Sequence, residues 1–480
     1  ASLVIFSLRI GASKVIALVA AAANLFVSLV VFASFERTDA VQFVFEKVWI
    51  SSLGINFNLG IDGISLLLIL LTTVMVPFII LSSFGNHYDK PWTFYGLVLL
   101  MQSALRGVFT ARDGFLFYLF WEMALIPIYF ICLIWGGENR ARITLKFFIY
   151  TLAGSLLMLV ALIYVYYQTP GVHSFGIAAL YEAGQKLSVT EQGFVFWGLF
   201  IAFAVKMPVF PFHTWQPDTY TVAPVQGTML LSAIMLKMGL FGLIRWLLPV
   251  VPAGVQEWGM VAVVLSVIGI VYASCIAMVQ KDFKRLIAYS SIAHVGLISA
   301  GILTATQDGL QGALIQMLSH GILVFGLFFV VELIGDRTDT RNIAELGGIR
   351  NEAPVFTTVF VVLMLGSVAL PMTSGFVGEF LLIKSVFQYE AWIGAMAGLT
   401  IILGAVYMLR SYQGAMSGET VPATQNFADL KTLEKFVLYP IVILVILIGV
   451  YPSPLMEISE ASVAKLVNDL STFTATAAGK

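Results

Sequence analysis

The sequence predicts an all-α polytopic membrane protein of about 14 transmembrane helices, with two inverted five-helix repeats that each contain a broken helix. Charged residues make up only 11% of the 480 residues and hydrophobic residues 59%, whereas a soluble domain has roughly 25% charged residues. The second observation is a series of apolar runs near 20 residues in length, which is enough to cross about 30 Å of hydrocarbon. The third is a nearly constant spacing between the ionisable residues inside these runs.

Composition also excludes several classes of protein. The net charge of −1, without a long basic or acidic run, argues against a nucleic-acid partner. Cys132 and Cys275 are the only cysteines and both lie in apolar segments, so we expect no disulfide framework, no thiolate metal site and no iron–sulfur cluster in this chain. The lipid bilayer is therefore the expected surrounding.

The expected spans follow the chain in order. Residues 1–92 should form N-terminal helices, in which residues 1–9 are too short to span and are interpreted as the remainder of an incomplete first helix. Full spans are expected at about 12–34, 58–84, 93–110, 113–135, 144–167, 193–220, 223–249, 256–279, 285–304, 309–334, 355–387, 392–412 and 435–454.

Residues 413–480 should contain the last span and an amphipathic helix that lies along the membrane interface. In the segment 455–472, the apolar side chains Ile458, Leu466 and Leu470 can share one face. The acidic residues of the same segment stay in water on the other face, and they are Glu457, Glu460 and Asp469.

Basic residues gather in alternate loops and so predict the orientation. One side carries Lys90, Arg140, Arg142, Lys281, Lys284, Arg285, Arg337, Arg341, Arg350, Lys431 and Lys435. The other side carries Arg37, Lys47, Arg112, Lys186, Lys465 and Lys480. The richer side is expected to be cytoplasmic.

The ionisable residues inside the spans indicate an internal repeat, 93–249 followed by 256–412. His294 follows Glu122 by 172 residues, and His320 follows Lys146 by 174. Glu379 follows Lys206 by 173, as Arg410 follows Lys237. Because each copy contains five spans, an odd number, the two copies enter the membrane from opposite sides, as in transporters with ion sites between their repeats.

A broken helix is expected in the fourth span of each repeat. In the first, Lys206 ends an apolar stretch and is followed by Pro208 and Pro211, which interrupt helical hydrogen bonding. In the second, the interruption is 370–375, and its proline does not superpose on the first break at a spacing of 173. Broken backbone at membrane depth is tolerated only where protein or a water-filled cavity satisfies it, so these segments are the expected ion pathway.

A line of titratable groups then follows from the spans. Glu122 has no charged neighbour in sequence, and Lys206 is its natural partner, holding the carboxylate ionised and releasing a proton when another cation approaches. Lys237 is the next acceptor, His294 and His320 extend the line, and Glu379 closes it. Such a series of acids and bases suits protons better than sodium, which prefers converging oxygen ligands.

Plainer interpretations stand beside these. Lys206 could form a structural ion pair or extend to the surface, and single helical histidines often serve only in packing. Lys146 follows Arg140 and Arg142 near the start of a span, so it is either an interface anchor or a group at which protons enter. Arg410 is expected to extend to the interface.

Together these segments resemble the antiporter-like proton-pumping subunits of respiratory complex I. The resemblance covers the chain after about residue 58 and rests on Glu122 in FYLFWEMALIPIYF, Lys206 in FAVKMPVFPFHTW, Lys237 in LKMGLFGLIR, the segment KDFKRLIAYSSIAHVG at 281–296, His320 in LSHG and Glu379 in SGFVGEF. Within this family, the chain fits the type with a glutamate in the second broken helix and without a long lateral helix at its C-terminus.

The resemblance implies a fourteen-helix fold with two inverted repeats and a role as a non-redox subunit of a proton-translocating NADH:quinone oxidoreductase. It implies that Glu122 and Lys206 are the coupled pair of the first half-channel, that Lys237 is the central relay, and that His294, His320 and Glu379 lead to the periplasmic side. NADH, FMN, iron–sulfur clusters and quinone would belong to partner subunits, with none of them bound by this chain. The partners would be other membrane-arm subunits, including neighbouring antiporter-like ones, in the bacterial cytoplasmic membrane.

Two departures limit what the resemblance implies. The chain reads Pro217-Asp218-Thr219-Tyr220 where the family usually has a histidine in fourth place, and Arg106 puts a charge late in a span. The alternatives within the same plan are multisubunit cation/proton antiporters and membrane-bound hydrogenases. A solute carrier and a non-pumping scaffold are the alternatives from other classes.

Overall fold

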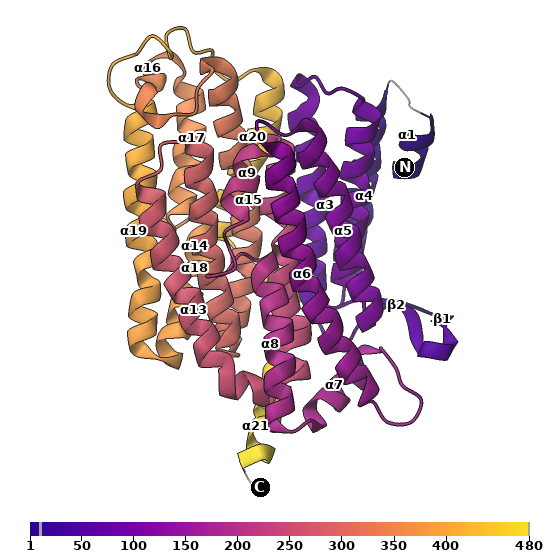
Figure 1. Ribbon diagram of the computed structural model, residues 1–480. Helices are drawn as coiled ribbons and strands as arrows, with labels where there is room; N and C mark the ends of the chain where they lie inside the picture. The colour runs from indigo at the N-terminus through magenta and orange to yellow at the C-terminus, as the bar shows by residue number, and fades with distance from the viewer. Residues whose placement is uncertain (9–11, 479–480) are drawn as a thin grey trace.

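The chain forms an upright bundle of long helices (Figure 1). The computed structural model describes residues 1–8 and 12–478. Within these residues, eleven helices are long and apolar enough to cross a membrane. The 20-residue helix α4 (Pro91–Thr110) and the broken pair α17 (Pro354–Ser367) and α18 (Ser374–Tyr389) occupy the two remaining expected spans. Each of the thirteen full spans expected from the sequence thus has a helical counterpart.

The helices succeed one another as follows. The N-terminal part contains α1 (Ser2–Leu8), α2 (Ser13–Ser34) and α3 (Gly63–Ser82). The region expected to be the first repeat contains α4, α5 (Gly114–Trp135), α6 (Arg140–Tyr167), α7 (Ile177–Lys186), α8 (Val189–Lys206), α9 (Gln216–Val222) and the span Val225–Val250. The region expected to be the second contains α13 (Pro252–Met278), α14 (Phe283–Leu303), α15 (Gln307–Thr338), α16 (Ile349–Glu352), α17, α18 and α19 (Ala391–Met416). The chain continues into α20 (Thr432–Val450) and α21 (Ser453–Ala478).

The span Val225–Val250 is irregular along its length. It consists of α10 (Val225–Met229), α11 (Lys237–Gly242) and α12 (Leu248–Val250), joined by π-helical segments at Leu230–Met235 and Leu243–Leu247. Single turns of 3₁₀ helix lie at Ser51–Leu53, Ser83–Gly85 and Ile343–Glu345. Wide π turns are frequent at functional sites, and here one of them directly precedes Lys237.

Several spanning helices begin at residues whose side chains accept hydrogen bonds from the first turn. Asp62 accepts from the amide of Ser65 at the start of α3, and Asp113 caps α5. Asp282 and Thr306 cap α14 and α15 in the same way. Each cap satisfies a backbone N–H that has no partner within its helix, which explains where these helices start.

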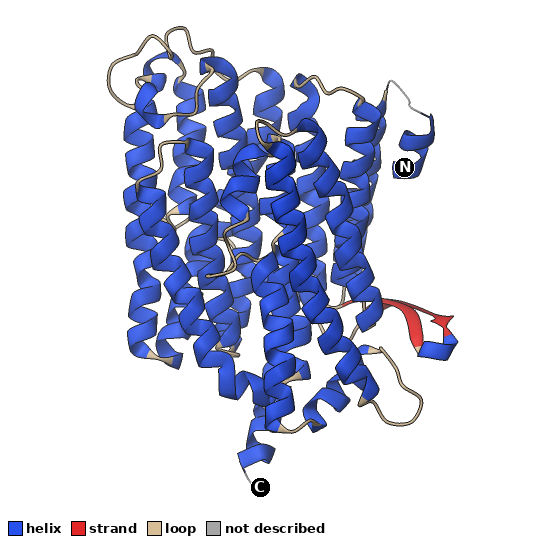
Figure 2. Cartoon of the chain, in the orientation of Figure 1, coloured by secondary structure: helices blue, strands red, loops and turns tan. Residues whose placement is uncertain are grey.

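A β-hairpin is the element that the sequence analysis missed. Strands β1 (Gln42–Ile50) and β2 (Ile55–Ile61) pair in antiparallel fashion, and Gly54 between them has a φ of 60°. The span expected from residue 58 therefore begins only at Gly63, because residues 55–61 belong to a strand. The signal was the aromatic and β-branched composition of 42–50 and the glycine turn. Figure 2 shows the hairpin projecting from one side of the bundle.

Helix α21 packs on the end of the bundle that carries α7. Ile458 is buried, and Leu466 and Leu470 are partly buried against the hydrophobic core, while Glu460 and Asp469 are exposed. Glu457 forms an ion pair with Arg37, which precedes the hairpin. The amphipathic pattern of this helix thus covers the start of α3, where the backbone of Gly63 closely approaches Ile458.

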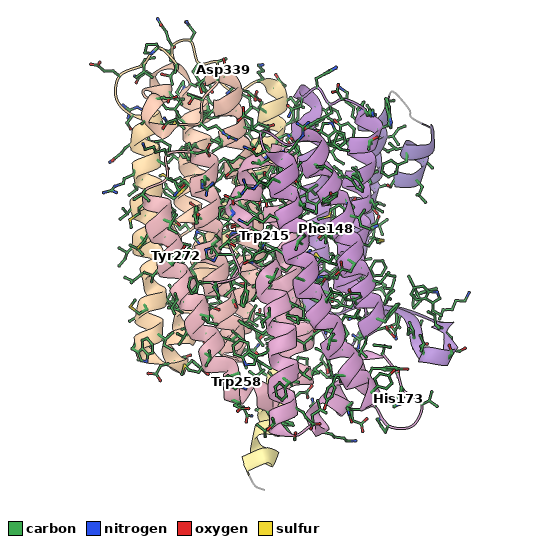
Figure 3. The ribbon with its side chains drawn as sticks, in the orientation of Figure 1. Phe148, His173, Trp215, Trp258, Tyr272 and Asp339 are labelled. Carbon is green, nitrogen blue, oxygen red and sulfur yellow. The ribbon has the colours of Figure 1, made fainter. Side chains whose placement is uncertain are left out.

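The two ends of the bundle differ in charge. The loops at 83–90, 136–139, 279–282, 339–348 and 417–431 meet at the end marked by α16 and by Asp339 (Figure 3), and we call this the basic end. The hairpin, His173 and Trp258 lie at the opposite end (Figure 3). The basic end carries the residues on which the expected cytoplasmic orientation depends; of the residues used for that expectation, Lys480 lies outside the described part of the chain.

Candidate functional site

The centre of the bundle holds a hydrogen-bonded series of three side chains from three helices. The Nζ of Lys237 lies 2.8 Å from Nδ1 of His320 on α15, and it donates a second hydrogen bond of 2.7 Å to the carbonyl of Ser232. The Nε2 of His320 lies 2.8 Å from Oγ of Ser291 on α14. Lys237 and His320 are both buried. The structure thus brings Lys237 and His320, two residues of the expected line, into direct contact.

A second buried pair lies beside the first. Nδ1 of His294 lies 2.9 Å from Oε1 of Glu379, at an angle that is not that of a hydrogen bond, so the contact is electrostatic. Oε1 of Glu379 accepts a hydrogen bond of 3.1 Å from Nε2 of Gln316, whereas Oε2 has no partner. The rings of His294 and His320 are 5.9 Å apart.

A small cavity of about 10 Å³ connects the two pairs, with His294, His320, Gln316, Ser290 and Glu379 in its lining. About 10–15 Å³ is the least volume that holds one water molecule. The unpartnered Oε2 of Glu379 is a polar group that such a water would satisfy. The cavity thus provides room for a single bridging water between the two histidines and the glutamate.

The break between α17 and α18 positions this second pair. Helix α18 starts at Ser374, whose Oγ accepts a hydrogen bond of 2.7 Å from Ser319, the neighbour of His320 on α15. Gly378 then passes so close to Gln316 that an added Cβ would lie 2.9 Å from the Cα of Gln316. These two contacts hold the first turns of α18 against α15, so that Glu379 faces the histidines.

Lys206 lies at the end of α8, directly before the first break. It is 2% exposed, and its Nζ lies 5.3 Å from the centroid of the Trp121 ring. Glu122, the next residue on α5, interacts with Lys206 electrostatically. Among the ion pairs of the described residues none joins Lys206 to Glu122, and Oε1 of Glu122 has no hydrogen-bond partner. The expected pair is therefore separated, with a tryptophan face beside the lysine.

Close helix packing connects Lys206 to the central series. Gly239, two residues after Lys237, lies so near α8 that an added Cβ would be 2.9 Å from Cβ of Met207 and 2.8 Å from the carbonyl of Phe203. Trp215 follows the break and donates a hydrogen bond of 2.8 Å back to the carbonyl of Val205. Figure 2 shows loop segments interrupting helices at mid-height in the bundle.

Lys146 differs from the other candidates because it is exposed. Its Nζ lies 3.1 Å from Oδ2 of Asp218 and donates a 2.9 Å hydrogen bond to the carbonyl of Thr214, and its side chain is 42% exposed. Asp218 also pairs with Arg285 at 3.1 Å. Lys146 thus belongs to a polar group at the edge of the first break.

Among the ionisable residues that the sequence analysis missed, two lie near the basic end, and they are the partly buried Glu332 and the buried Lys284. Glu332 lies in the apolar span of α15, twelve residues after His320, and was overlooked there. Lys284 was assigned to a loop, yet it lies in the first turn of α14, is 2% exposed and donates hydrogen bonds to the carbonyls of Ala223 and Thr221. The available signal for Glu332 was a carboxylate within the otherwise apolar stretch 309–334.

No group of three or more His, Cys, Asp or Glu side chains that could hold a metal ion occurs in residues 1–8 and 12–478. The buried polar groups that the site does offer are the lysines, histidines and carboxyls described above.

An interrupted membrane bundle with a buried line of Glu, Lys and His defines an antiporter-like membrane subunit. The model of the family described as NADH:quinone oxidoreductase/Mrp antiporter, TM, matches residues 111–404. The chain belongs to this family.

Relatives and solved structures agree with this assignment. NADH-quinone oxidoreductase subunit M of Rhodobacter capsulatus is 41% identical over 482 residues, which cover 97% of this chain and 93% of the relative. Subunit M of Rickettsia conorii is 41% identical over 429 residues, covering 89% and 86%. F420H2 dehydrogenase subunit M of Methanosarcina mazei is 38% identical over 448 residues, covering 91% and 89%.

A chain in the structure of respiratory complex I from Thermus thermophilus with bound NADH superposes with a TM-score of 0.88 at 29% identity, covering 97% of this chain and 98% of that one. A chain of the Mrp complex from Dietzia sp. has a TM-score of 0.85 at 18% identity, covering 99% and 97%, and so shows a shared fold. The resemblance that the sequence motifs predicted, including the subunit type with a glutamate in the second broken helix, is confirmed.

Proposed function

We propose that this chain is the proton-translocating subunit M of a bacterial NADH-quinone oxidoreductase, located in the cytoplasmic membrane. The observation that carries the proposal is the buried series in which Lys237 contacts His320 and His294 contacts Glu379, within the core of a membrane bundle. NADH, FMN, iron–sulfur clusters and quinone would be bound by partner subunits. The relatives named subunit M and the fold shared with complex I support this assignment.

The geometry suggests how a proton moves. Lys237 donates to Nδ1 of His320, so the proton on Nε2 of the imidazole points to Ser291. Addition of a proton at Nδ1 therefore releases the one at Nε2. A water in the small cavity would carry it to His294, from which Glu379 accepts it. Histidine suits this role because its proton affinity lies near neutral pH.

Lys206 and Glu122 supply the coupled pair ahead of Lys237. In a medium of low dielectric, the charge on one buried group strongly changes the proton affinity of the next. Lys206 is held near Lys237 by the contact between α8 and Gly239. Energy from electron transfer in the partner subunits would enter as a change in the charge or position of this pair and pass along the line.

The test is the variant Lys206→Ala in the purified complex, reconstituted in sealed vesicles. NADH-driven pH change and electron transfer to quinone are measured in parallel, and both are expected to fall together. Lys281→Ala is the control, because Lys281 is exposed at the basic end. Unchanged pumping and NADH oxidation in Lys206→Ala would show that the lysine is structural and would contradict the proposal.

The electron donor requires a separate experiment, because the family includes Mrp antiporters and one relative is named for F420H2 rather than NADH. Affinity purification of the tagged chain from its native membrane should bring down subunits that oxidise NADH. Recovery of a complex with no NADH oxidation, but with sodium/proton exchange, would instead assign the chain to a cation/proton antiporter.

A further inference from the structure

We propose that Glu332 is the proton-loading residue of a second entrance, through which protons reach Lys237 directly from the basic end of the bundle. The inference rests on the proposed proton translocation and adds a route that bypasses Glu122 and Lys206. The species that enters by this route is a proton, delivered by water molecules.

Glu332 is surrounded by neutral hydrogen-bond donors instead of a counter-ion in direct contact. Oε1 accepts a hydrogen bond of 2.8 Å from Asn86, and both carboxyl oxygens lie 3.2–3.3 Å from Nε2 of Gln226. Tyr88 donates a 2.5 Å hydrogen bond to Oε1 of Gln226. Lys284 interacts with Glu332 electrostatically but donates its hydrogen bonds elsewhere. A carboxyl held by amides remains free to take up and release a proton, whereas a salt-bridged one is held ionised.

A polar cavity of about 200 Å³ leads to this carboxyl from the basic end. The cavity is lined by Asn86 and by several charged residues, which are Glu332, Asp336, Arg337, Lys431 and Glu434. Arg337 and Glu434 are paired with each other at 2.5 Å. Since a water molecule occupies about 30 Å³ in the liquid, the cavity has room for several waters that could deliver a proton to Glu332.

The polar residues of this region form a layer on the same helices as the central series. Gln226 precedes Lys237 by 11 residues, and Lys284 precedes His294 by 10. Glu332 follows His320 by 12 residues on a helix of opposite direction. At 1.5 Å per residue these intervals are all about 15–18 Å, so the layer lies at one depth between the basic end and the centre.

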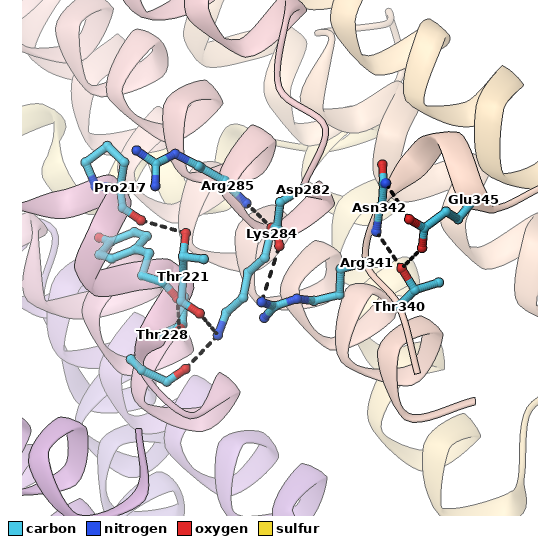
Figure 4. Close-up of polar contacts among 12 residues, drawn as sticks. Pro217, Thr221, Thr228, Asp282, Lys284, Arg285, Thr340, Arg341, Asn342 and Glu345 are labelled. Carbon is cyan, nitrogen blue, oxygen red and sulfur yellow. Dashed lines mark hydrogen bonds and ion pairs between the residues drawn. The ribbon is translucent and has the colours of Figure 1, made fainter. Parts of the chain in front are cut away.

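Unpartnered buried groups mark a path between the two layers. Tyr220 and Gln216 on α9 are both buried, and the Tyr220 hydroxyl interacts with the side chain of Gln216. No bond of full hydrogen-bond geometry satisfies the hydroxyl or either polar atom of this amide. The ring of Tyr220 packs against Phe328, one turn from Glu332 on α15. Lys284 reaches across to the end of α9, as Figure 4 shows.

Hydroxyl groups continue the path toward Lys237. Thr228 donates a hydrogen bond of 2.9 Å to the carbonyl of Tyr220, and Ser232 donates one of 2.7 Å to the carbonyl of Thr228. The carbonyl of Ser232 in turn accepts from Nζ of Lys237. Buried polar atoms without protein partners are the positions where internal water binds. The geometry thus points to a hydrated route from Glu332 past Tyr220 to Lys237.

The test uses the intact complex in inverted membrane vesicles, in which the cytoplasmic side faces the medium. Glu332→Gln keeps the size of the side chain and removes its ability to take up a proton. NADH-driven pumping is expected to fall to the part that the entrance through Glu122 and Lys206 still carries, because a positioned proton-transfer group is lost from the second entrance. Glu332→Asp should retain most of the pumping, and a small weak acid such as azide should restore it in Glu332→Gln. The matched control is Glu419→Gln, because Glu419 is exposed at the same end.

The outcomes separate this inference from the proposed function, with Lys237→Ala measured alongside. Wild-type pumping in Glu332→Gln together with failure of Lys237→Ala would overturn the entrance and leave the proposed function standing. Wild-type pumping in both would overturn the proposed function. Loss of pumping in Glu332→Gln that neither aspartate nor azide restores would show a structural role and also overturn the entrance. If Glu332→Gln does not assemble, Tyr220→Phe tests the same route, and normal pumping in that variant would refute it.

Discussion

The contact between Lys237 and His320 gives the sharpest test of the relay. In His320→Ala the Nζ of Lys237 loses its 2.8 Å partner and keeps only the carbonyl of Ser232. A hydrogen bond to a charged group contributes about 1.5–3 kcal/mol. Since about 1.4 kcal/mol corresponds to a tenfold change in an equilibrium constant, the loss weakens the binding of the lysine ammonium at this position by about 10- to 150-fold. Pumping that depends on this bound ammonium should fall by up to the same factor.

A second substitution separates positioning from proton transfer. The side-chain carbonyl of glutamine in His320→Gln can accept the hydrogen bond from Lys237, but an amide does not take up a proton near neutral pH. If His320 only positions the lysine, His320→Gln should pump normally. If the imidazole carries the proton, both variants should be impaired.

The assay is the initial rate of NADH-driven acidification in inverted vesicles, followed with a pH-sensitive dye. Electron transfer from NADH to ferricyanide, measured in the same vesicles, reports the amount of assembled complex. His87→Ala is the matched control, since His87 is exposed in the loop after α3. Wild-type pumping in His320→Gln would refute transfer through the imidazole, and wild-type pumping in His320→Ala would also refute the importance of the contact.

Two further predictions concern packing and stability. In Gly378→Ala the new Cβ would lie 2.6 Å from Cβ and 2.9 Å from Cα of Gln316, so overpacking should destabilise the complex by about 1–3 kcal/mol and reduce pumping. Both effects are measured, by thermal unfolding and by the pumping assay. Gly398→Ala is the control and should be neutral in both assays, because the nearest atom to its new Cβ is 4.0 Å away. Asp62→Asn keeps a capping side chain but removes the counter-ion of Arg245, which lies 2.5 Å away. Thermal unfolding should show that the solubilised complex is destabilised by about 3–5 kcal/mol. The control is Asp39→Asn, which alters only an exposed ion pair. Burial by itself raises the pKa of Asp62, but Arg245 and the hydrogen bond from Ser65 outweigh burial and hold the pKa below its ordinary value. The stability that Asp62 contributes should therefore be present above the ordinary carboxyl pKa and be lost as the pH falls through the lowered pKa. Asp62→Asn should remove this dependence of stability on acid pH.

The membrane class and the spans could be predicted because each depends on local composition. A run of 20 apolar residues has few alternatives to a spanning helix, and a charge within it is conspicuous. The hairpin was missed because a search for long apolar runs passes over a strand pair of nine and seven residues, whose signal is a period of two.

The partners of the site residues could not be predicted, because they depend on which helix faces meet. His320 could be placed on the line from its span, but its contacts with Lys237 and Ser291 come from two other helices. Gln316 is uncharged and did not stand out in the sequence, although it is the hydrogen-bond donor to Glu379. Glu122 and Lys206 were expected to be electrostatic partners, and in the structure they interact through space, with Trp121 beside the lysine.

The two broken helices place their ionisable residues at different positions relative to the break, although these residues are separated by the same spacing of 173 as Lys237 and Arg410. Lys206 is the last residue of α8, before its break, whereas Glu379 is the sixth residue of α18, after its break. The C-terminal end of a helix favours a cation by about 0.3–1 kcal/mol, so the position of Lys206 helps to retain its charge. The corresponding effect at a helix N-terminus is largely confined to the first turn, which Glu379 has passed. Glu379 is held instead by its contacts with His294 on α14 and Gln316 on α15. The first break thus places its ionisable residue at a helix C-terminus, whereas the second places it against side chains of two neighbouring helices.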